Sequence, residues 1–241
     1  SRVSHHGAHG GQMTLSQGSP MTIRKENADI YISPRNKEEI KNVISIAKKY
    51  NMPVTVIGNG SNLLVSDKGI RGIVIQIGKD MCDVVVEGQK VKAEAGALLS
   101  AIGAEALKYH LKGFAFASGI PGSLGGAVCM NAGAYGGEMK DILLEVEVLT
   151  KELETKILSV EELAFSYRHS IIPEKEYIVL CATLQLEKGE YAAIQKEMTE
   201  LAEQRREKQP LNFASAGSTF KRPQGYFAGK LIMDSGLAGY Q

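Results

Sequence analysis

Residues 118–137 have the sequence SGIPGSLGGAVCMNAGAYGG, which is the most unusual stretch of the chain. Ordering so many glycines is costly, because glycine loses more backbone freedom on folding than any other residue. The stretch shows neither a helical nor a strand period, lacks charged side chains and is interleaved with Ile, Leu, Val and Met. Such a composition favours a buried backbone that lines a flat ligand over a mobile surface loop. We call it the second glycine segment.

The first glycine segment, residues 58–62 (GNGSN), directly follows the β-branched run 54–57. Its glycines allow the backbone to come close to a ligand, and successive N–H groups with the Ser61 hydroxyl and the Asn62 amide can cradle a pyrophosphate. The segment is neither G-x-G-x-x-G nor a P-loop, so we do not expect binding at a helix N-terminus. By itself it is equally compatible with a tight turn.

The rest of the sequence predicts an α+β chain with two αβ units and the beginning of a third. In the first unit, strands are expected at 28–32, 54–57 and 72–77, and Asn36 with Glu39 marks the N-terminus of a helix. Later strands are expected at 84–86, 91–95, 143–149, 156–160 and 177–186. Later helices are expected at 98–106, 194–201 and 226–233.

The composition is that of a globular protein, with 44% hydrophobic and 23% charged residues. A formal net charge of +1, from 28 basic and 27 acidic residues, gives no global attraction to nucleic acid or to a membrane surface. No apolar run reaches the roughly 18 residues of a membrane helix, and no signal peptide is evident. The three cysteines form no C-x-x-C pair, so we expect no structural metal and a cytoplasmic location. His110 and His169 have no evident carboxylate partner, and no obligate protein partner is indicated.

Four motifs occur along the chain in a fixed order: 56–65 (VIGNGSNLLV), 119–136 within the second glycine segment, 165–168 (FSYR) and 216–221 (AGSTFK). Together they resemble the UDP-N-acetylenolpyruvoylglucosamine reductase family, and the resemblance runs from about Ala28 to the last residue. A chance match of four motifs in register is not expected.

The resemblance implies an α+β fold of the vanillyl-alcohol-oxidase/p-cresol-methylhydroxylase type, in which two subdomains hold FAD. The first FAD-binding subdomain would span 21–78 and the second 79–208, with a truncated third, substrate-binding subdomain beginning at 209–241. Residues 1–20 would be a disordered tail or a cloning remnant. The implied flavin contacts are Gly58, Asn59, Gly60, Ser61, Asn62, Gly119, Ile120, Pro121, Gly122, Ser123, Gly125, Gly126, Ala127, Asn131, Gly133 and Ala134.

The reaction implied by the resemblance takes a hydride from NADPH through FAD to UDP-N-acetylglucosamine enolpyruvate. Its intermediate needs a positive charge beside the carboxylate and a proton donor, and Arg168 and Ser218 match these two catalytic roles. Tyr135, Tyr167 and Lys221 are implied substrate contacts. Without the resemblance, Arg168 would more often be a surface ion-pair partner and Ser218 the cap of a turn.

The chain departs from the family pattern at two places. Residues 21–29 lack the paired glycines that usually precede the first strand. The family continues beyond Gln241 and supplies a glutamate near its end, for which no residue here can be assigned. We therefore expect flavin binding to be kept and turnover of the enolpyruvyl substrate to be impaired.

Two other functions remain open from the sequence. One is a different flavin oxidoreductase of the same superfamily, in which a His or Cys near the glycine segments often tethers the flavin. Cys129 is the only candidate there, which disfavours a covalent flavin. The other is an FAD-binding module without catalytic activity, which would be indifferent to the loss of the Ser218 hydroxyl.

Overall fold

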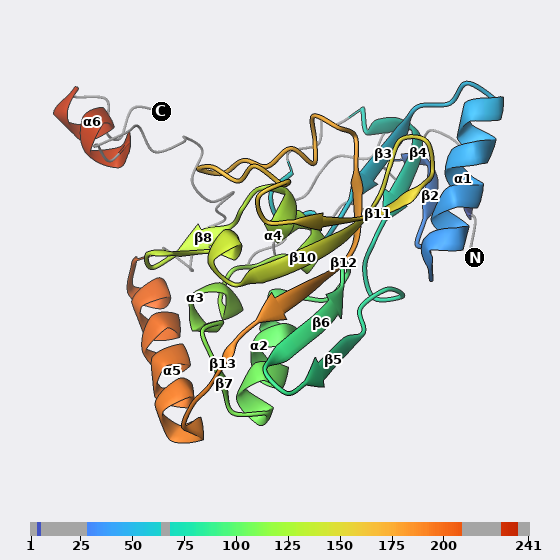
Figure 1. The fold of residues 1–241 in the computed structure, drawn as a ribbon. Helices are drawn as coiled ribbons and strands as arrows, with labels where there is room; N and C mark the ends of the chain where they lie inside the picture. The colour runs from blue at the N-terminus through green and yellow to red at the C-terminus, as the bar shows by residue number, and fades with distance from the viewer. Residues whose placement is uncertain (1–3, 6–27, 64–67, 209–227, 236–241) are drawn as a thin grey trace.

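Two larger β-sheets, two two-stranded sheets and the helices packed on them make up the described part of the fold (Figure 1). The structure is a computed structural model that describes residues 4–5, 28–63, 68–208 and 228–235. The first sheet draws its strands from residues up to Gln76, and the second begins at Val84. The chain thus passes from the first sheet to the second close to residue 78, where the subdomain boundary is expected. The α+β class is confirmed.

The first sheet has the order β1-β2-β4-β3, formed by Ser4–His5, Ala28–Ile32, Ile70–Gln76 and Val54–Ile57. Strands β2 and β3 both run parallel to β4, so β2 and β3 must be joined by a crossover. Helix α1 (Lys37–Lys49) provides it and lies beside the sheet in Figure 1. The two-residue strand β1 pairs antiparallel with β2, in a region where the sequence indicates no strand.

Helix α1 begins where the sequence predicts. The Asn36 side chain accepts a hydrogen bond from the Glu39 backbone N–H at 3.0 Å, which satisfies one of the free donors of the first turn. Acidic residues occupy this turn and Lys48 and Lys49 the last one, as the helix dipole favours. Ile40 and Ala47 are buried against the sheet, so the helix is held by its apolar face.

The second sheet is antiparallel, with the order β11-β10-β12-β6-β5. Its strands are Thr155–Ser159, Leu143–Leu149, Ile178–Gln185, Lys90–Glu94 and Val84–Glu87. Each lies within about two residues of its predicted range, and Gly88 makes the β5–β6 turn with a φ of +62°. Strands β6 and β12 alternate buried and more exposed residues, so one face packs on the core.

Helices cover this buried face of the second sheet. They are α2 (Leu99–Lys108), α3 (Ala115–Ser118) and α4 (Leu124–Cys129), and α5 (Tyr191–Lys208) packs against α2 and α3. The small elements are β7 (Leu111–Lys112), β8 (Gly133–Ala134), β9 (Gly137–Glu138), η2 (Met139–Asp141), β13 (Glu187–Lys188) and α6 (Ala228–Asp234). Within the described residues, no helix is long and apolar enough to cross a membrane.

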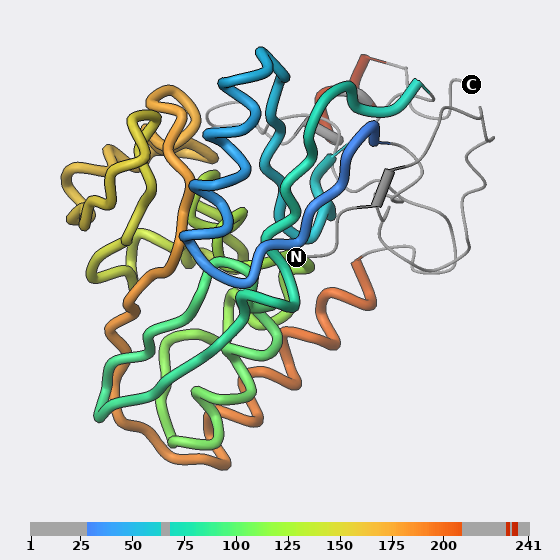
Figure 2. Tube along the Cα trace, turned by 90° about the vertical axis from the view of Figure 1, so that its right-hand side faces the viewer, coloured from blue at the N-terminus to red at the C-terminus, as the bar shows by residue number. Residues whose placement is uncertain are grey.

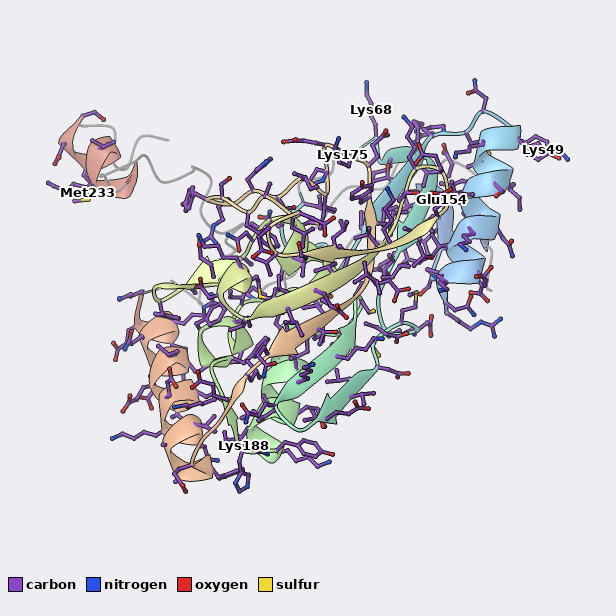
Figure 3. The ribbon with its side chains drawn as sticks, viewed as in Figure 1. Lys49, Lys68, Glu154, Lys175, Lys188 and Met233 are labelled. Atoms are coloured by element: carbon purple, nitrogen blue, oxygen red, sulfur yellow. The ribbon has the colours of Figure 1, made fainter. Side chains whose placement is uncertain are left out.

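The two sheets share one hydrophobic core. Ile40 and Ile75 from the first unit belong to the same buried cluster as Leu99 and Val146 from the second. Seen from the side in Figure 2, α1 lies at one end of the molecule and the β5–β6 hairpin at the other. Two exposed lysines lie far apart on the surface, Lys49 on α1 and Lys188 in β13 (Figure 3). Because residues of both sheets belong to one buried cluster, the two sheets are joined by a packed interface.

The second glycine segment is more regular than the sequence suggests. It contains all of α4 and the β8 strand, although the sequence shows no helical or strand period there. Gly125 explains why a glycine-containing helix forms: its N–H donates to the Ala95 carbonyl at 2.9 Å, and a Cβ on it would lie 3.1 Å from the Ala95 Cβ. Close packing on the sheet therefore outweighs the low helix propensity of glycine.

Candidate functional site

The two glycine segments lie against each other, although they are about sixty residues apart in the chain. The Ser61 hydroxyl donates a hydrogen bond to the Pro121 carbonyl at 2.9 Å. A Cβ on Gly122 would lie 3.3 Å from the Ser61 Oγ, so the two backbones are in close approach. The Asn62 amide lies 3.8 Å from the Met130 sulfur. The structure thus brings the expected flavin-binding residues of both segments together.

Gly58 and Ser123 form the tightest contact between the segments. A Cβ on Gly58 would collide with the Ser123 hydroxyl, so a larger residue at this position requires Ser123 to shift. The Gly58 carbonyl accepts a hydrogen bond from the Gln76 side chain at 3.1 Å, which fixes the end of β3. At this point the site is therefore lined by the backbone of Gly58 on one side and by the Ser123 hydroxyl on the other.

The Ser123 hydroxyl is buried and has no hydrogen-bond partner among the described residues. A buried polar atom left in this way costs about 1–3 kcal/mol, so such atoms commonly mark a place where another group binds. Ser123 precedes α4, but its side chain makes no capping bond there. A free hydroxyl between two glycine-rich backbones fits the polar middle of a dinucleotide such as FAD.

The second segment is held in place by residues just before and at the start of α2. The Leu99 N–H donates to the Gly122 carbonyl at 3.1 Å, and the Leu124 N–H donates to the Ala97 carbonyl at 2.9 Å. Gly125, Gly126 and Ala127 follow inside α4 rather than in a loop. These bonds order the ligand-contacting backbone in the absence of a ligand, which lowers the entropic cost of binding.

Arg168 sits on a tight turn formed by residues 166–169, which we call the Arg168 turn. Ser166 and His169 exchange two backbone hydrogen bonds, of 3.1 and 3.2 Å. Arg168 has a φ of +52°, a left-handed conformation that costs a non-glycine residue about 1–2 kcal/mol. Such strain persists only where the surroundings enforce it, and it is typical of functional sites.

The Arg168 guanidinium reaches the second glycine segment. Its Nη2 donates to the Gly133 carbonyl at 2.9 Å, and its central carbon lies 5.5 Å from the centroid of the Tyr167 ring. Arg168 is half-buried and makes no ion pair with any described residue. The surface ion pair considered from the sequence is therefore not observed between Arg168 and the described residues. Most of the guanidinium donors remain available for an anion.

The remaining described residues of the expected site have mixed surroundings. The Tyr135 hydroxyl donates to the Leu201 carbonyl of α5 at 3.1 Å, although its side chain is partly exposed. Tyr167 is exposed beside Arg168. Asn131 is fully buried, and its amide bonds the Ser166 carbonyl and the Lys140 N–H at 3.1 and 3.0 Å. Ser218 and Lys221 lie outside the described residues.

Two features near the Arg168 turn escaped the sequence interpretation. Ser170 is fully buried and donates to the Cys129 carbonyl at 2.6 Å, yet a serine in this position has no local pattern that predicts it. The expectation that His169 lacks a carboxylate partner was wrong, because its Nε2 lies 3.0 Å from Glu174. The four intervening residues bend back in a turn, which a strand or helix period would not reveal.

Burial raises the pKa of the Cys129 thiol to about 11, so this residue stays protonated near neutral pH. A protonated thiol is a poor nucleophile, which agrees with the expectation that no cysteine tethers the flavin. Within the described residues, no group of three or more His, Cys, Asp and Glu side chains could hold a metal ion.

Comparison with known proteins matches both parts of the chain. Residues 28–158 match the family described as FAD binding domain, and residues 209–241 match the C-terminal domain of UDP-N-acetylenolpyruvoylglucosamine reductase. The reductase from Caldanaerobacter subterraneus subsp. tengcongensis is 55% identical over 88% of this chain and 70% of its own length. That from Agathobacter rectalis is 53% identical over 95% of this chain and 78% of its own length.

Solved structures agree with the sequence matches. The crystal structure of the reductase from Thermus caldophilus superposes with a TM-score of 0.76 at 36% identity, covering 88% of this chain and 75% of that one. Alkyldihydroxyacetonephosphate synthase, with a TM-score of 0.50 at 18% identity over 67% of this chain and 32% of that one, shares the fold alone. The expected two-subdomain FAD-binding fold is thus confirmed, and this chain belongs to the UDP-N-acetylenolpyruvoylglucosamine reductase family of FAD-containing oxidoreductases.

Proposed function

We propose that this chain reduces UDP-N-acetylglucosamine enolpyruvate to UDP-N-acetylmuramate in peptidoglycan precursor synthesis, with FAD as cofactor and NADPH as reductant. The observation that carries the proposal is the Arg168 guanidinium, held on a strained turn against Gly133 of the second glycine segment without an ion pair among the described residues. The three cysteines are free, which fits a reducing cytoplasm.

The glycine segments would hold FAD, with the Ser123 hydroxyl and the backbone around Gly58 and Gly122 lining its diphosphate. FAD, when bound, supplies the two-electron chemistry by taking a hydride from NADPH and giving it to the substrate alkene. Within this arrangement the residues of the chain have two tasks: to hold the enolpyruvyl carboxylate and to complete the addition with a proton.

Arg168 performs the first task. Hydride addition to one alkene carbon leaves negative charge on its neighbour, which spreads into the carboxylate as an enolate. A guanidinium that binds the carboxylate with two hydrogen bonds stabilises the enolate more than it stabilises the unreduced substrate. The Tyr167 ring beside Arg168 would help to orient it.

Ser218 performs the second task in this proposal. Its hydroxyl would give the proton to the carbon that carries the negative charge, which balances the reaction as one hydride and one proton added across the double bond. A serine hydroxyl needs a nearby positive charge to act as an acid, and Lys221 is the candidate for that or for a substrate phosphate. Residues 209–241 would form part of the substrate-binding region.

The proposal is tested by following the flavin absorbance of the purified protein without oxygen. NADPH is expected to bleach the absorbance, and the enolpyruvyl substrate is then expected to restore it and to yield UDP-N-acetylmuramate by mass spectrometry. Slow restoration with formation of UDP-N-acetylmuramate would still support the proposed substrate. Bleaching with no product from the enolpyruvyl substrate would favour another flavin oxidoreductase, and FAD binding with no bleaching by NADPH would favour a binding module.

Replacing Gly58 with alanine is expected to weaken FAD binding by at least about 10-fold, because the new methyl group collides with Ser123 and pushes the glycine segments apart. Titration of FAD fluorescence measures the dissociation constant. Gly88→Ala in the β5–β6 turn is the control, since Gly88 also resists substitution through its φ of +62° but has open space around it. Equal FAD affinity in both variants would exclude Gly58 from the flavin site.

A further inference from the structure

Two buried side chains hold the flanks of the Arg168 turn. On one side, the Asn131 amide donates to the Ser166 carbonyl at 3.1 Å. On the other, the Ser170 hydroxyl donates to the Cys129 carbonyl at 2.6 Å and accepts from the Ile172 N–H at 3.3 Å. Both side chains have no exposed surface. The turn is therefore attached at both ends to the segment that contains α4.

The attachment points lie next to the candidate flavin site. Cys129 is the last residue of α4, and Asn131 follows two residues later with a φ of +45°. The Asn131 carbonyl oxygen of the side chain also accepts from the Lys140 N–H at 3.0 Å, so this amide bridges three parts of the chain. Both polar ends of its side chain are engaged by protein backbone and not directed at a ligand.

We propose that Ser170 and Asn131 are positioning residues, which hold the Arg168 guanidinium at a fixed place relative to the glycine segments. The left-handed backbone of Arg168 needs such support, because the turn would otherwise relax to a less strained conformation. The Gly133 carbonyl, which accepts from Arg168 at 2.9 Å, belongs to the same attached segment. One rigid unit thus carries both the guanidinium and the backbone beside the flavin.

This inference rests on the proposed role of Arg168 in binding the enolpyruvyl carboxylate, and it goes beyond that role by assigning two residues whose side chains bond the backbone of the chain. For Asn131, this positioning role takes the place of the flavin contact that the resemblance implies. It predicts a selective defect. Only the step that uses Arg168 should slow when a positioning residue is lost, because FAD binding and reduction by NADPH depend on the glycine segments.

Ser170→Ala is expected to lower the rate at which the enolpyruvyl substrate restores the flavin absorbance by about 10-fold or more, since misplacing a catalytic group by about 1 Å costs up to 10²-fold. The FAD dissociation constant and the rate of bleaching by NADPH are expected to stay within about 2-fold. Ser170→Thr, which keeps a hydroxyl, is expected to recover part of the loss. Stopped-flow spectroscopy measures both rates separately.

Thr150→Ala is the matched control. Thr150 is buried in the β10–β11 turn, where its hydroxyl accepts from the Glu154 N–H at 3.1 Å, and it has no contact with the Arg168 turn among the described hydrogen bonds. Its loss removes a comparable buried hydrogen bond and should change neither rate. A slower reoxidation in Thr150→Ala equal to that of Ser170→Ala would overturn the inference, because general destabilisation would then explain both.

A double variant decides whether Ser170 acts through Arg168. In an Arg168→Ala background, Ser170→Ala is expected to add less than about 2-fold, because the group that it positions is gone. A full additional loss would overturn the inference, and so would loss of bound FAD in Ser170→Ala alone. If Arg168→Ala itself left reoxidation unchanged, the proposed role of Arg168 and this inference would both be overturned. The proposed reaction would stand, because the enolpyruvyl substrate would still reoxidise the flavin.

Discussion

Arg168→Ala is expected to lower substrate-dependent reoxidation of the flavin by about 10³-fold, the loss typical of removing a group that stabilises developing charge. The guanidinium already donates to Gly133 and has no carboxylate partner among the described residues, so its charge is directed at the site. Bleaching by NADPH is expected to remain within about 3-fold, because that step creates no enolate. Stopped-flow measurement of the two half-reactions separates these effects.

Two further arginine variants sharpen the test. Arg168→Lys keeps the charge but not the planar pair of donors, so it is expected to recover only part of the rate. Arg35→Ala is the control: Arg35 is exposed and pairs with Glu39 at 2.7 Å at the start of α1, so its loss should leave both half-reactions unchanged. If Arg168→Ala slowed both half-reactions equally, Arg168 would be a general structural residue.

The regular elements could be predicted because their causes are local. Asn36 and Glu39 mark the start of α1 through a hydrogen bond between residues three positions apart. Gly88 marks a hairpin because glycine readily adopts the positive φ of the turn. Strand β10 was predicted at its observed bounds, because its leucines and valines are interleaved with Glu145 and Glu147. Each of these signals can be recognised in a window of a few residues.

Helix α4 could not be predicted in the same way. Gly125 and Gly126 disfavour a helix, and the cause of its formation is the contact of Gly125 with Ala95, thirty residues earlier. The four motifs pointed correctly to the family, but they gave no sign that part of the second glycine segment would be helical. A contact between distant residues leaves no period in the sequence of either partner.

The same limit applies within the candidate site. The motifs named Arg168, yet its left-handed backbone, its bond to Gly133 and the support from Ser170 depend on contacts about 35 to 41 residues apart. Ser123 was expected among the flavin contacts as one member of a motif. Its buried hydroxyl without a partner in the described part of the chain is what makes it distinctive.

Ser218→Ala is expected to lower substrate-dependent reoxidation by about 10²–10⁴-fold, the usual contribution of a positioned proton donor. Without the hydroxyl, negative charge forms on the substrate with no nearby proton, so hydride transfer becomes readily reversible. NADPH bleaching and FAD affinity should be unchanged, because neither requires a proton at this carbon. The variant should therefore be yellow, reducible and slow only with the enolpyruvyl substrate.

Ser215→Ala is the matched control, because Ser215 lies three residues earlier, directly before the same motif, and loses the same hydroxyl. If both variants slowed reoxidation equally, the segment as a whole would matter rather than the Ser218 proton. The Arg168 and Ser218 variants also differ in substrate affinity: losing the carboxylate partner should raise the dissociation constant for the enolpyruvyl substrate, whereas losing the proton donor should leave it nearly unchanged. An unchanged reoxidation rate in Ser218→Ala would remove Ser218 from the mechanism and leave the carboxylate role of Arg168 intact.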